Sequence, residues 1–477
     1  MNKQTTGVPA ASTATVSSAS DASDASDAST ASTASTASTA STASTAPIAP
    51  IAPIAPTDIG RAGAPPSLDA GSRHWRANLT VCVFGSFTTI VGMTLLLPFL
   101  PLYVAQLGVK DHAAIVEWSG VAFGATFFTA ALTAPLWGRL ADRYGRKLML
   151  IRASLGMAVA MSLIGLSQNV WQLVALRLLA GLLGGYASGS TILVATQTPK
   201  HRTGWALGIL SSGIMAGNIA GPMIGGSLPP LIGIRATFFA SGALIFIAFV
   251  ATTLLIREER PAPAPARQAN ARREGWRTLA DKRPVAAMLL TGMLLMLANM
   301  SIEPIITVYV AQLVDARHVT FVSGLVMSAA ALGSIVSASR LGKLADRVGH
   351  WNVIIGCLVA SAALLVPQAF VTQAWQLIGL RFLMGLALGG LLPCVASVIR
   401  HNVPASVAGN MLGYSTSAQY TGQVVGPLVG GFVGGHIGMR AVFLGTCVLM
   451  AGGALYNRTV HRAVRTQPRA AVSERPR

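Results

Sequence analysis

The octapeptide Gly138-Arg-Leu-Ala-Asp-Arg-Tyr-Gly145 recurs 204 residues later as Gly342-Lys-Leu-Ala-Asp-Arg-Val-Gly349. Two further pairs keep this spacing to within one residue: Trp171-Gln-Leu with Trp375-Gln-Leu, and Gly221-Pro222 with Gly426-Pro427. Because separate motifs repeat at almost one offset, the sequence predicts a duplicated unit. Parallel repeats in membrane proteins place a binding site between the two halves, near the bilayer midplane.

The composition around these motifs indicates that lipid is the main solvent. Of the 477 residues 52% are hydrophobic and 11% are charged, whereas soluble domains average about 25% charged residues. Apolar stretches of about 20 residues, the length that crosses a bilayer as a helix, alternate with short polar connections from Leu79 onward. These stretches do not alternate with period two, as the strands of a membrane barrel do. The predicted spans are 80–103, 114–136, 148–167, 171–194, 205–228, 236–256, 285–311, 319–340, 351–371, 375–398, 408–433 and 440–457.

We therefore predict an all-α membrane protein with twelve transmembrane helices in two pseudo-symmetric six-helix bundles. The bundles are expected at residues 73–256 and 285–457, joined by a cytoplasmic central loop at 257–284 and followed by a basic tail at 458–477. Residues 1–72 consist largely of Asp-Ala-Ser, Ser-Thr-Ala and Pro-Ile-Ala triplets. Such a segment cannot bury enough apolar surface to fold, which predicts a disordered tail.

The basic residues predict the orientation. The net charge of +19 would suggest nucleic acid as the partner of a soluble protein. Here the Lys and Arg residues lie between apolar segments, so we expect a lipid bilayer and no nucleic acid. Twenty-six of them fall on the side of the termini in the twelve-span topology and four on the opposite side. The positive-inside rule then places both termini in the cytoplasm, with the chain in the plasma (inner) membrane.

Several kinds of chemistry have no sequence signal. The four cysteines lie in apolar runs without metal-binding spacing. No GxxxxGK[ST] loop for a nucleotide is found, and no cluster of catalytic residues stands out. We expect no enzyme activity, no metal and no cofactor.

The repeated motifs resemble those of the major facilitator superfamily over about residues 74–460. Within it, the chain resembles the twelve-helix drug/proton antiporters at Pro98–Gly108, Gly145–Leu150, Ala195–Pro199 and Gly204–Gly208. The resemblance implies a monomeric secondary transporter that exports lipophilic or amphipathic small molecules in exchange for protons, by alternating access. Two alternatives stay open: a transporter for one metabolite, such as a sugar or an organic anion, and a sensor or scaffold that transports nothing.

The repeated octapeptide is predicted to control the change of conformation. Gly138 and Gly145 would allow a tight turn, and Asp142 could accept hydrogen bonds from a helix N-terminus. The resemblance implies that this N-terminus is the start of the eleventh helix, which would hold the two halves together. The alternative is a basic loop that serves only insertion into the membrane. The candidate gating residues are Gly138, Asp142, Arg143, Gly145, Arg146, Gly342, Asp346, Arg347 and Gly349.

The fifth span carries glycines at the spacing that the resemblance identifies as an antiporter motif, which implies export. Proline kinks a membrane helix, and glycines permit close packing, here expected against the other half. The alternative is a purely structural role, since glycine is common in membrane helices. The motif residues are Gly208, Gly217, Gly221, Pro222, Gly225 and Gly226.

Ionisable residues inside spans are costly and usually functional. Arg177 lies in the fourth span, and the resemblance links it to proton transfer. The alternative is a structural ion pair, with Asp142 as one partner. Its repeat image Arg381 is expected to serve packing. A drug/proton antiporter also needs a carboxylate that gains and loses a proton, and within the spans Glu303 and Glu117 are the candidates. The alternative for both is a hydrated position at a helix end.

Polar side chains in the spans are candidates for the substrate cavity. Gln419 and Gln423 lie one helical turn apart and therefore share a face. For each candidate, an ordinary hydrogen bond between helices is the alternative. The candidates are Asn218, Asn299, Gln419, Tyr420 and Gln423.

Overall fold

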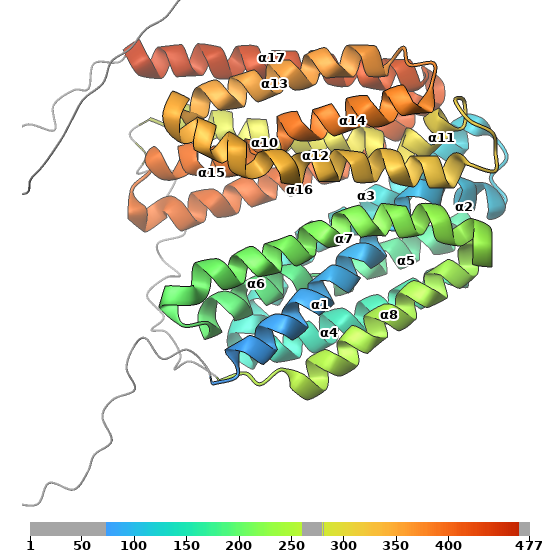
Figure 1. Cartoon of the computed structure of the whole chain (residues 1–477), viewed down its shortest axis with the longest axis horizontal. Coiled ribbons are helices and arrows are strands. Elements are labelled where there is room, and N and C mark those ends of the chain that lie inside the picture. Colours follow the sequence, from blue (N-terminus) through green and yellow to red (C-terminus); the bar gives the residue numbers. More distant parts are fainter. Residues whose placement is uncertain (1–72, 260–278, 280, 467–477) are drawn as a thin grey trace, which may run out of the picture. The chain divides into compact units, whose positions relative to one another are not determined.

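The computed structural model of the chain describes residues 73–259, 279 and 281–466, and within this part it contains helices and no strand. The predicted tail at 1–72, most of the central loop and residues 467–477 lie outside the described residues. Helices with blue to green colours form one bundle and those with yellow to red colours another (Figure 1).

The first bundle contains eight α-helices because two of its six spans are interrupted. These are α1 (Trp75–Thr94), α2 (Leu100–Gln106), α3 (His112–Tyr144), α4 (Arg146–Gly165), α5 (Val170–Leu183), α6 (Tyr186–Gln197), α7 (Thr203–Ile232) and α8 (Ile234–Leu255). The second bundle repeats this order. Its helices are α10 (Arg283–Ile302), α11 (Ile306–Val310), α12 (Val319–Val348), α13 (His350–Gln368), α14 (Ala374–Leu388), α15 (Leu391–His401), α16 (Ala405–His436) and α17 (Met439–Thr466).

Eleven helical segments among the described residues are long and apolar enough to cross a membrane, and each coincides with a predicted span. The remaining predicted span, 408–433, lies in α16, which has 32 residues but is not among the eleven. Its Gly, Ser, Thr and Gln residues make it less apolar than the others. Helices α10 and α3 pack against α16, so neighbouring protein takes the place of lipid on these sides. The predicted fold of twelve helices in two bundles is confirmed.

The interruptions, which hydropathy did not predict, occur at equivalent places in the two bundles. The first span is broken by a short 3-10 helix, η1 (Leu97–Phe99), and its repeat partner by η3 (Glu303–Ile305). The second residue of each is a proline, Pro98 or Pro304. Since proline has no amide hydrogen to donate to the preceding turn, it favours a break there.

The fourth span and its repeat partner are broken at glycine pairs. Gly184–Gly185 separates α5 from α6, and Gly389–Gly390 separates α14 from α15. Gly185 has φ +104°, a backbone conformation that other L-residues rarely adopt. Interrupted helices bring unpaired backbone and polar groups into the middle of a bundle, where transporters build their sites.

The two bundles touch at the end that is remote from the termini, where glycines allow close contact between backbones. A Cβ placed on Gly226 of α7 would lie 2.6 Å from the carbonyl oxygen of Thr320 in α12. A Cβ on Gly431 of α16, in the equivalent position, would lie 3.1 Å from the carbonyl oxygen of Val116 in α3. Both contacts therefore depend on the absence of a side chain.

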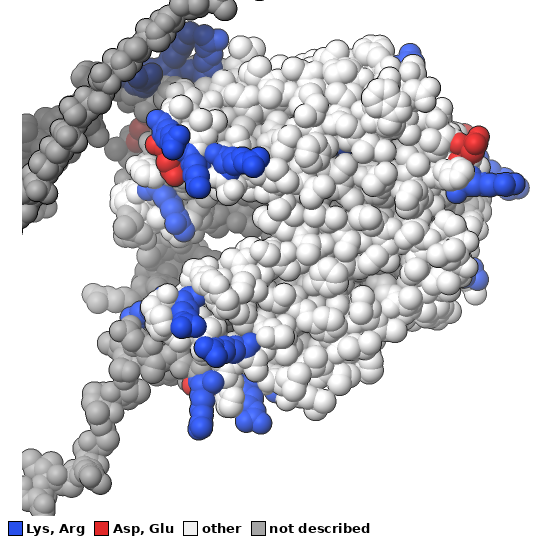
Figure 2. Space-filling model, viewed as in Figure 1, with Lys and Arg blue, Asp and Glu red and all other residues white. Residues whose placement is uncertain are grey.

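At the opposite end, the same helices carry glycines that face open space. A Cβ on Gly208, near the start of α7, or on Gly413, near the start of α16, would meet no atom within 4 Å. Further along α7, the Ser328 hydroxyl of α12 donates a hydrogen bond of 2.8 Å to the carbonyl oxygen of Ile219. The bundles are thus joined at one end and separated at the end that carries the termini, where Figure 2 shows a hollow between them.

Asn78 of α1 joins three segments at this end of the first bundle. Its side-chain amide donates hydrogen bonds to the Gln197 side chain (2.9 Å) and to the Arg257 carbonyl oxygen (2.8 Å). Its side-chain oxygen accepts one from the backbone amide of Arg257 at 3.0 Å. The side chain is buried, so it fixes the start of the central loop to the bundle.

We expect Asn78→Ala to destabilise the protein by about 1–3 kcal/mol, because buried partners would be left without hydrogen bonds. The measurement is the temperature of thermal unfolding of the purified protein in detergent. Asn352→Ala is the matched control, since Asn352 is exposed and donates one hydrogen bond, to the carbonyl oxygen of Val348 four residues earlier. Equal unfolding temperatures for the two variants would contradict the prediction.

Candidate functional site

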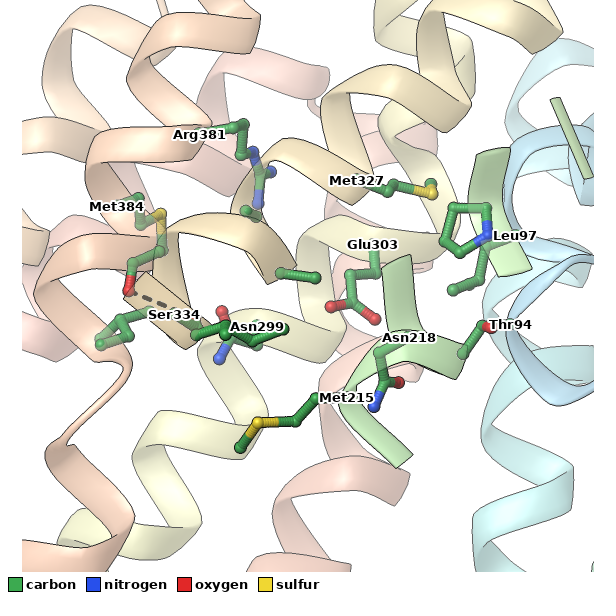
Figure 3. A pocket seen from close by; sticks show the side chains of 16 residues that line it. Thr94, Leu97, Met215, Asn218, Asn299, Glu303, Met327, Ser334, Arg381 and Met384 are labelled. Carbon is green, nitrogen blue, oxygen red and sulfur yellow. Dashed lines mark hydrogen bonds between the residues drawn. The ribbon is translucent and has the colours of Figure 1, made fainter. Parts of the chain in front are cut away.

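A cavity of about 310 Å³ lies between the two bundles and is lined by both. The first bundle contributes residues of α1, η1 and α7, and the second contributes residues of α10, η3, α12 and α14. Figure 3 shows Glu303 in the middle of the cavity, with Asn218 and Asn299 beside it. The volume lies at the lower end of the range for small-molecule sites, roughly 300–1,000 Å³.

The interruption of the seventh span positions Glu303. This residue opens η3, in the same way as Leu97 opens η1 in the first bundle, and both side chains line the cavity. The duplicated position therefore holds a carboxylate in one half and an apolar group in the other. Three methionines, Met215, Met327 and Met384, add flexible apolar surface to the walls.

Arg381 lines the cavity on the same bundle as Glu303, and the two opposite charges attract each other. Its side chain is 4% exposed and its guanidinium lies 5.9 Å from the ring centre of Phe443. Two of its nitrogens, Nε and Nη2, have no hydrogen-bond partner in the protein. The sequence suggested a packing role for Arg381, but the structure places it at the cavity with charged nitrogens available to a carboxylate or a ligand.

Arg177, the image of Arg381, is not part of the cavity wall. It is 1% exposed between α5 and α3, where its Nε donates a hydrogen bond of 3.3 Å to the carbonyl oxygen of Ala122. Its guanidinium lies 5.7 Å from the ring centre of Phe123. The alternative ion pair with Asp142 is not formed, because the Asp142 carboxylate pairs with Arg146.

The other carboxylate candidate, Glu117, lies in an exposed position near the start of α3. A Cβ on Gly431 of α16 would lie 3.3 Å from the carbonyl oxygen of Glu117, so this part of α3 forms the contact between the bundles. Glu117 is not among the residues that line the cavity. Of the two predicted carboxylates, the structure brings one, Glu303, to the cavity.

The five polar cavity candidates divide into two groups. Asn218 and Asn299 line the cavity. Gln419, Tyr420 and Gln423 do not: they are half-buried on α16, where the Gln423 amide lies 3.5 Å from the sulfur of Met296 and Gln419 bonds to its own helix. For the two glutamines the alternative interpretation, ordinary contacts of packed helices, fits better in this conformation.

The predicted gating loops lie at the separated end of the bundles. Asp142 forms an ion pair with Arg146, four residues later and beyond the Gly145 turn, and its side chain is 70% exposed. Its repeat image Asp346 has an oxygen 3.8 Å from the Nε2 atom of His350, likewise four residues later and beyond the Gly349 turn. Neither carboxylate is buried against the other bundle, as expected where the bundles are apart.

The turn itself depends on one glycine of each loop. Gly145 and Gly349 have φ +98° and +92°, so each makes the left-handed turn that ends one helix before the next begins. Gly138 lies inside α3, so the expectation that it forms a turn is wrong. Gly342, its repeat image, lies inside α12. Arg143 and Arg347 are exposed next to these turns.

Glu258, which the sequence did not single out, fixes the first of these turns. Its carboxylate accepts hydrogen bonds from the backbone amides of Arg146 (2.7 Å) and Lys147 (2.8 Å), the first residues of α4. A carboxylate at a helix N-terminus is favoured by the helix dipole. The sequence feature that could have indicated this contact is the pair of adjacent glutamates at 258–259, at the start of a loop rich in basic residues.

The glycines of the antiporter motif pack mainly within their own bundle. Gly217, Gly221 and Gly225 lie against the backbone or side chains of α1, and Gly226 lies against α12. Gly208 has free space around it. The expectation that the glycines pack against the other half is therefore correct for Gly226 but wrong for the three that contact α1. Pro222 lines the cavity.

Asp142→Asn is expected to lower the transport rate roughly five- to thirtyfold while leaving the protein in the membrane. A carboxylate at a partly buried helix N-terminus stabilises it by about 1–2 kcal/mol. The asparagine side chain would not provide this stabilisation in the conformation in which the bundles close over the loop. The measurement is the initial rate of transport, normalised to the amount of protein in membranes. Asp315→Asn, at an exposed position near the opposite end, is the matched control. Equal rates for the two variants would refute the gating role.

Comparison with known proteins adds to this geometry. The model of the Major Facilitator Superfamily matches residues 82–367 and 321–476. Multidrug resistance protein MdtG of Enterobacter lignolyticus is 43% identical over 384 residues, which cover 80% of this chain and 92% of that protein. Multidrug resistance protein MdtG of Proteus mirabilis is 41% identical over 392 residues, which cover 82% of this chain and 97% of that protein.

A solved structure supports the fold. It is that of a bacterial homolog of the human lysosomal transporter Spinster, in an inward-facing and occupied conformation. The TM-score is 0.68 at 15% identity, and the alignment covers 84% of this chain and 100% of the other.

Proposed function

Because the chain belongs to the major facilitator superfamily, we propose that it is a secondary active transporter which exports lipophilic or amphipathic drug-like molecules in exchange for protons. The observation that carries this proposal is the cavity between the bundles, where Glu303 and Arg381 lie among apolar and amide side chains. The names of relatives that are more than 40% identical over most of their length support multidrug export.

The proposed site combines adaptable apolar walls with one titratable group. Methionine side chains adjust to molecules of different shape, while Asn218 and Asn299 can donate and accept hydrogen bonds. Glu303 would bind either a proton or the polar end of a substrate. Arg381 would keep the carboxylate oriented and balance its charge when no proton is bound.

The proposed cycle starts from the conformation of this structure, which is open at the end with the termini. A substrate enters and displaces the proton from Glu303. The bundles then close at the Asp142 and Asp346 loops and separate at the Gly226 and Gly431 contacts. After the substrate has left, a proton from the outer side restores the carboxyl group and favours return.

The direction of export depends on the topology. The chain is a multi-pass membrane protein. We propose that it lies in the inner membrane as a monomer, with both termini in the cytoplasm, because basic residues are concentrated at the end with the termini (Figure 2). We also propose that the chain divides into bundles 73–256 and 285–457 with a central loop at 257–284, as the repeated motifs indicate. In this orientation the gating loops of Asp142 and Asp346 lie on the cytoplasmic side.

The test is drug accumulation in cells that express the protein. A lipophilic cation, a fluoroquinolone and a neutral dye would be compared before and after collapse of the proton gradient. We expect lower accumulation of at least one of them, and loss of this difference when the gradient is collapsed. If none of the three is exported, the multidrug proposal fails and a single metabolite, such as a sugar or an organic anion, becomes the candidate substrate.

A further inference from the structure

A second cavity lies on the first bundle, between α1 and α7 near the end with the termini. It is a groove of about 700 Å³. Its body is apolar and is formed by side chains such as Val83, Phe84, Phe87 and Ile209. The charged residues in its lining are Arg76, the second residue of α1, and Arg202, the residue before α7. No Asp or Glu is among the residues that line it.

This groove faces away from the central cavity. Ile209 lines the groove and Asn218 lines the central cavity. Nine residues of an α-helix make about two and a half turns, so the two side chains lie on opposite faces of α7. A helix face turned away from the space between the bundles is the one that meets lipid.

The length of the groove matches one leaflet of a bilayer. Its lining on α1 runs from Trp75 and Arg76 to Phe87, which corresponds to about 17–18 Å of helix. Half of the hydrocarbon core of a bilayer is about 15 Å thick. An acyl chain that begins at the arginines would therefore end near the bilayer midplane.

The mouth of the groove has the features of a membrane interface. The rings of Trp75 and Trp205 meet edge to face with their centres 6.3 Å apart, and Trp205 is 59% exposed. The Arg76 guanidinium lies 5.4 Å from the ring centre of Trp75. Tryptophan is enriched at the level of lipid headgroups, so the two arginines stand at the depth of the phosphates.

We propose that the groove binds one anionic phospholipid of the leaflet on the side of the termini. An acyl chain would lie along Val83, Phe87 and Ile209, and the phosphate would lie between Arg76 and Arg202. Arginine forms paired hydrogen bonds with phosphate oxygens, and the net positive charge of the mouth favours an anionic over a zwitterionic headgroup. This proposal does not depend on which substrate is transported.

The experiment is native mass spectrometry of the full chain, purified in detergent and titrated with phosphatidylglycerol or phosphatidylcholine of identical acyl chains. We expect phosphatidylglycerol to bind at least about tenfold more tightly, since two arginines near an anionic group contribute together more than that factor. The variant Arg76→Gln/Arg202→Gln should lose this preference. The matched control, Arg458→Gln/Arg465→Gln, removes two exposed arginines of α17 near the same end and should keep it.

A second variant tests the apolar body without a change of charge. Ala216 is exposed in the groove, so Ala216→Phe should fill it and weaken binding of both lipids. Equal affinity of the unmodified chain for the two lipids would overturn the proposal. Undiminished binding of phosphatidylglycerol by both Arg76→Gln/Arg202→Gln and Ala216→Phe would also overturn it. Loss of binding of a transported dye on Ala216→Phe, with phosphatidylglycerol unaffected, would also overturn it and make the groove an entry path for substrate.

Discussion

Glu303→Gln is expected to abolish export against a concentration gradient. Glutamine has nearly the shape of a protonated glutamate but cannot release a proton, so the coupling step is lost while the cavity keeps its form. Accumulation of an exported drug should equal that of cells without the protein, with or without the proton gradient. Exchange of labelled for unlabelled drug across vesicles, which needs no net proton movement, should persist.

Glu117→Gln is the matched control, since Glu117 is a carboxylate within a predicted span that does not line the cavity. We expect its gradient-driven export to stay close to that of the unmodified protein. If Glu303→Gln still concentrates the drug in a manner that depends on the gradient, Glu303 is not the proton carrier. If drug exchange is also lost, its role is in substrate binding.

Gly226→Val should lower the population of the present conformation by roughly five- to 150-fold. The new Cβ would lie 2.6 Å from the carbonyl oxygen of Thr320 in α12, a backbone atom that cannot move independently of the helix. Extra carbon in a packed contact typically costs about 1–3 kcal/mol. A cysteine at Met215, which lines the cavity, should react more slowly with an impermeant maleimide applied from the side of the termini.

The same variant should transport slowly, because one conformation of the cycle has become too rare. Gly204→Val is the matched control: it lies on the same helix, and a Cβ there would meet no atom within 4 Å. Unchanged labelling and unchanged transport in Gly226→Val would show that this contact does not hold the bundles together.

The repeats predicted most of the fold. An offset of 204 residues between octapeptides places the two halves, and the length of the apolar stretches places the spans. Hydropathy could not predict the interruptions at η1 and η3, since a broken helix is as apolar as a straight one. It also gives no reason why α16 is the least apolar span; in the structure Gln419 and Gln423 of this helix face α10 rather than water.

The candidate site was predicted less well because residues in equivalent positions have different surroundings. The motif drew attention to Arg177, whereas its image Arg381 lines the same cavity as Glu303. A signal was available in the sequence, because Glu303 occupies the position that Leu97 holds in the first half. Only the second half therefore has a carboxylate at this position, where the charge of Arg381 can balance it. The helix that each glycine contacts depends on the conformation of the protein, and a sequence motif does not specify the conformation.

The polar character of α16 bears on how the chain is made. This helix is less apolar than the other spans, so hydrophobicity contributes less to its insertion into the bilayer. Its sides are covered by α10 and α3, both of which are synthesised earlier and are already in the bilayer when α16 emerges. We therefore expect the final helical hairpin to insert against α10 and α3, so that the two halves depend on each other for assembly.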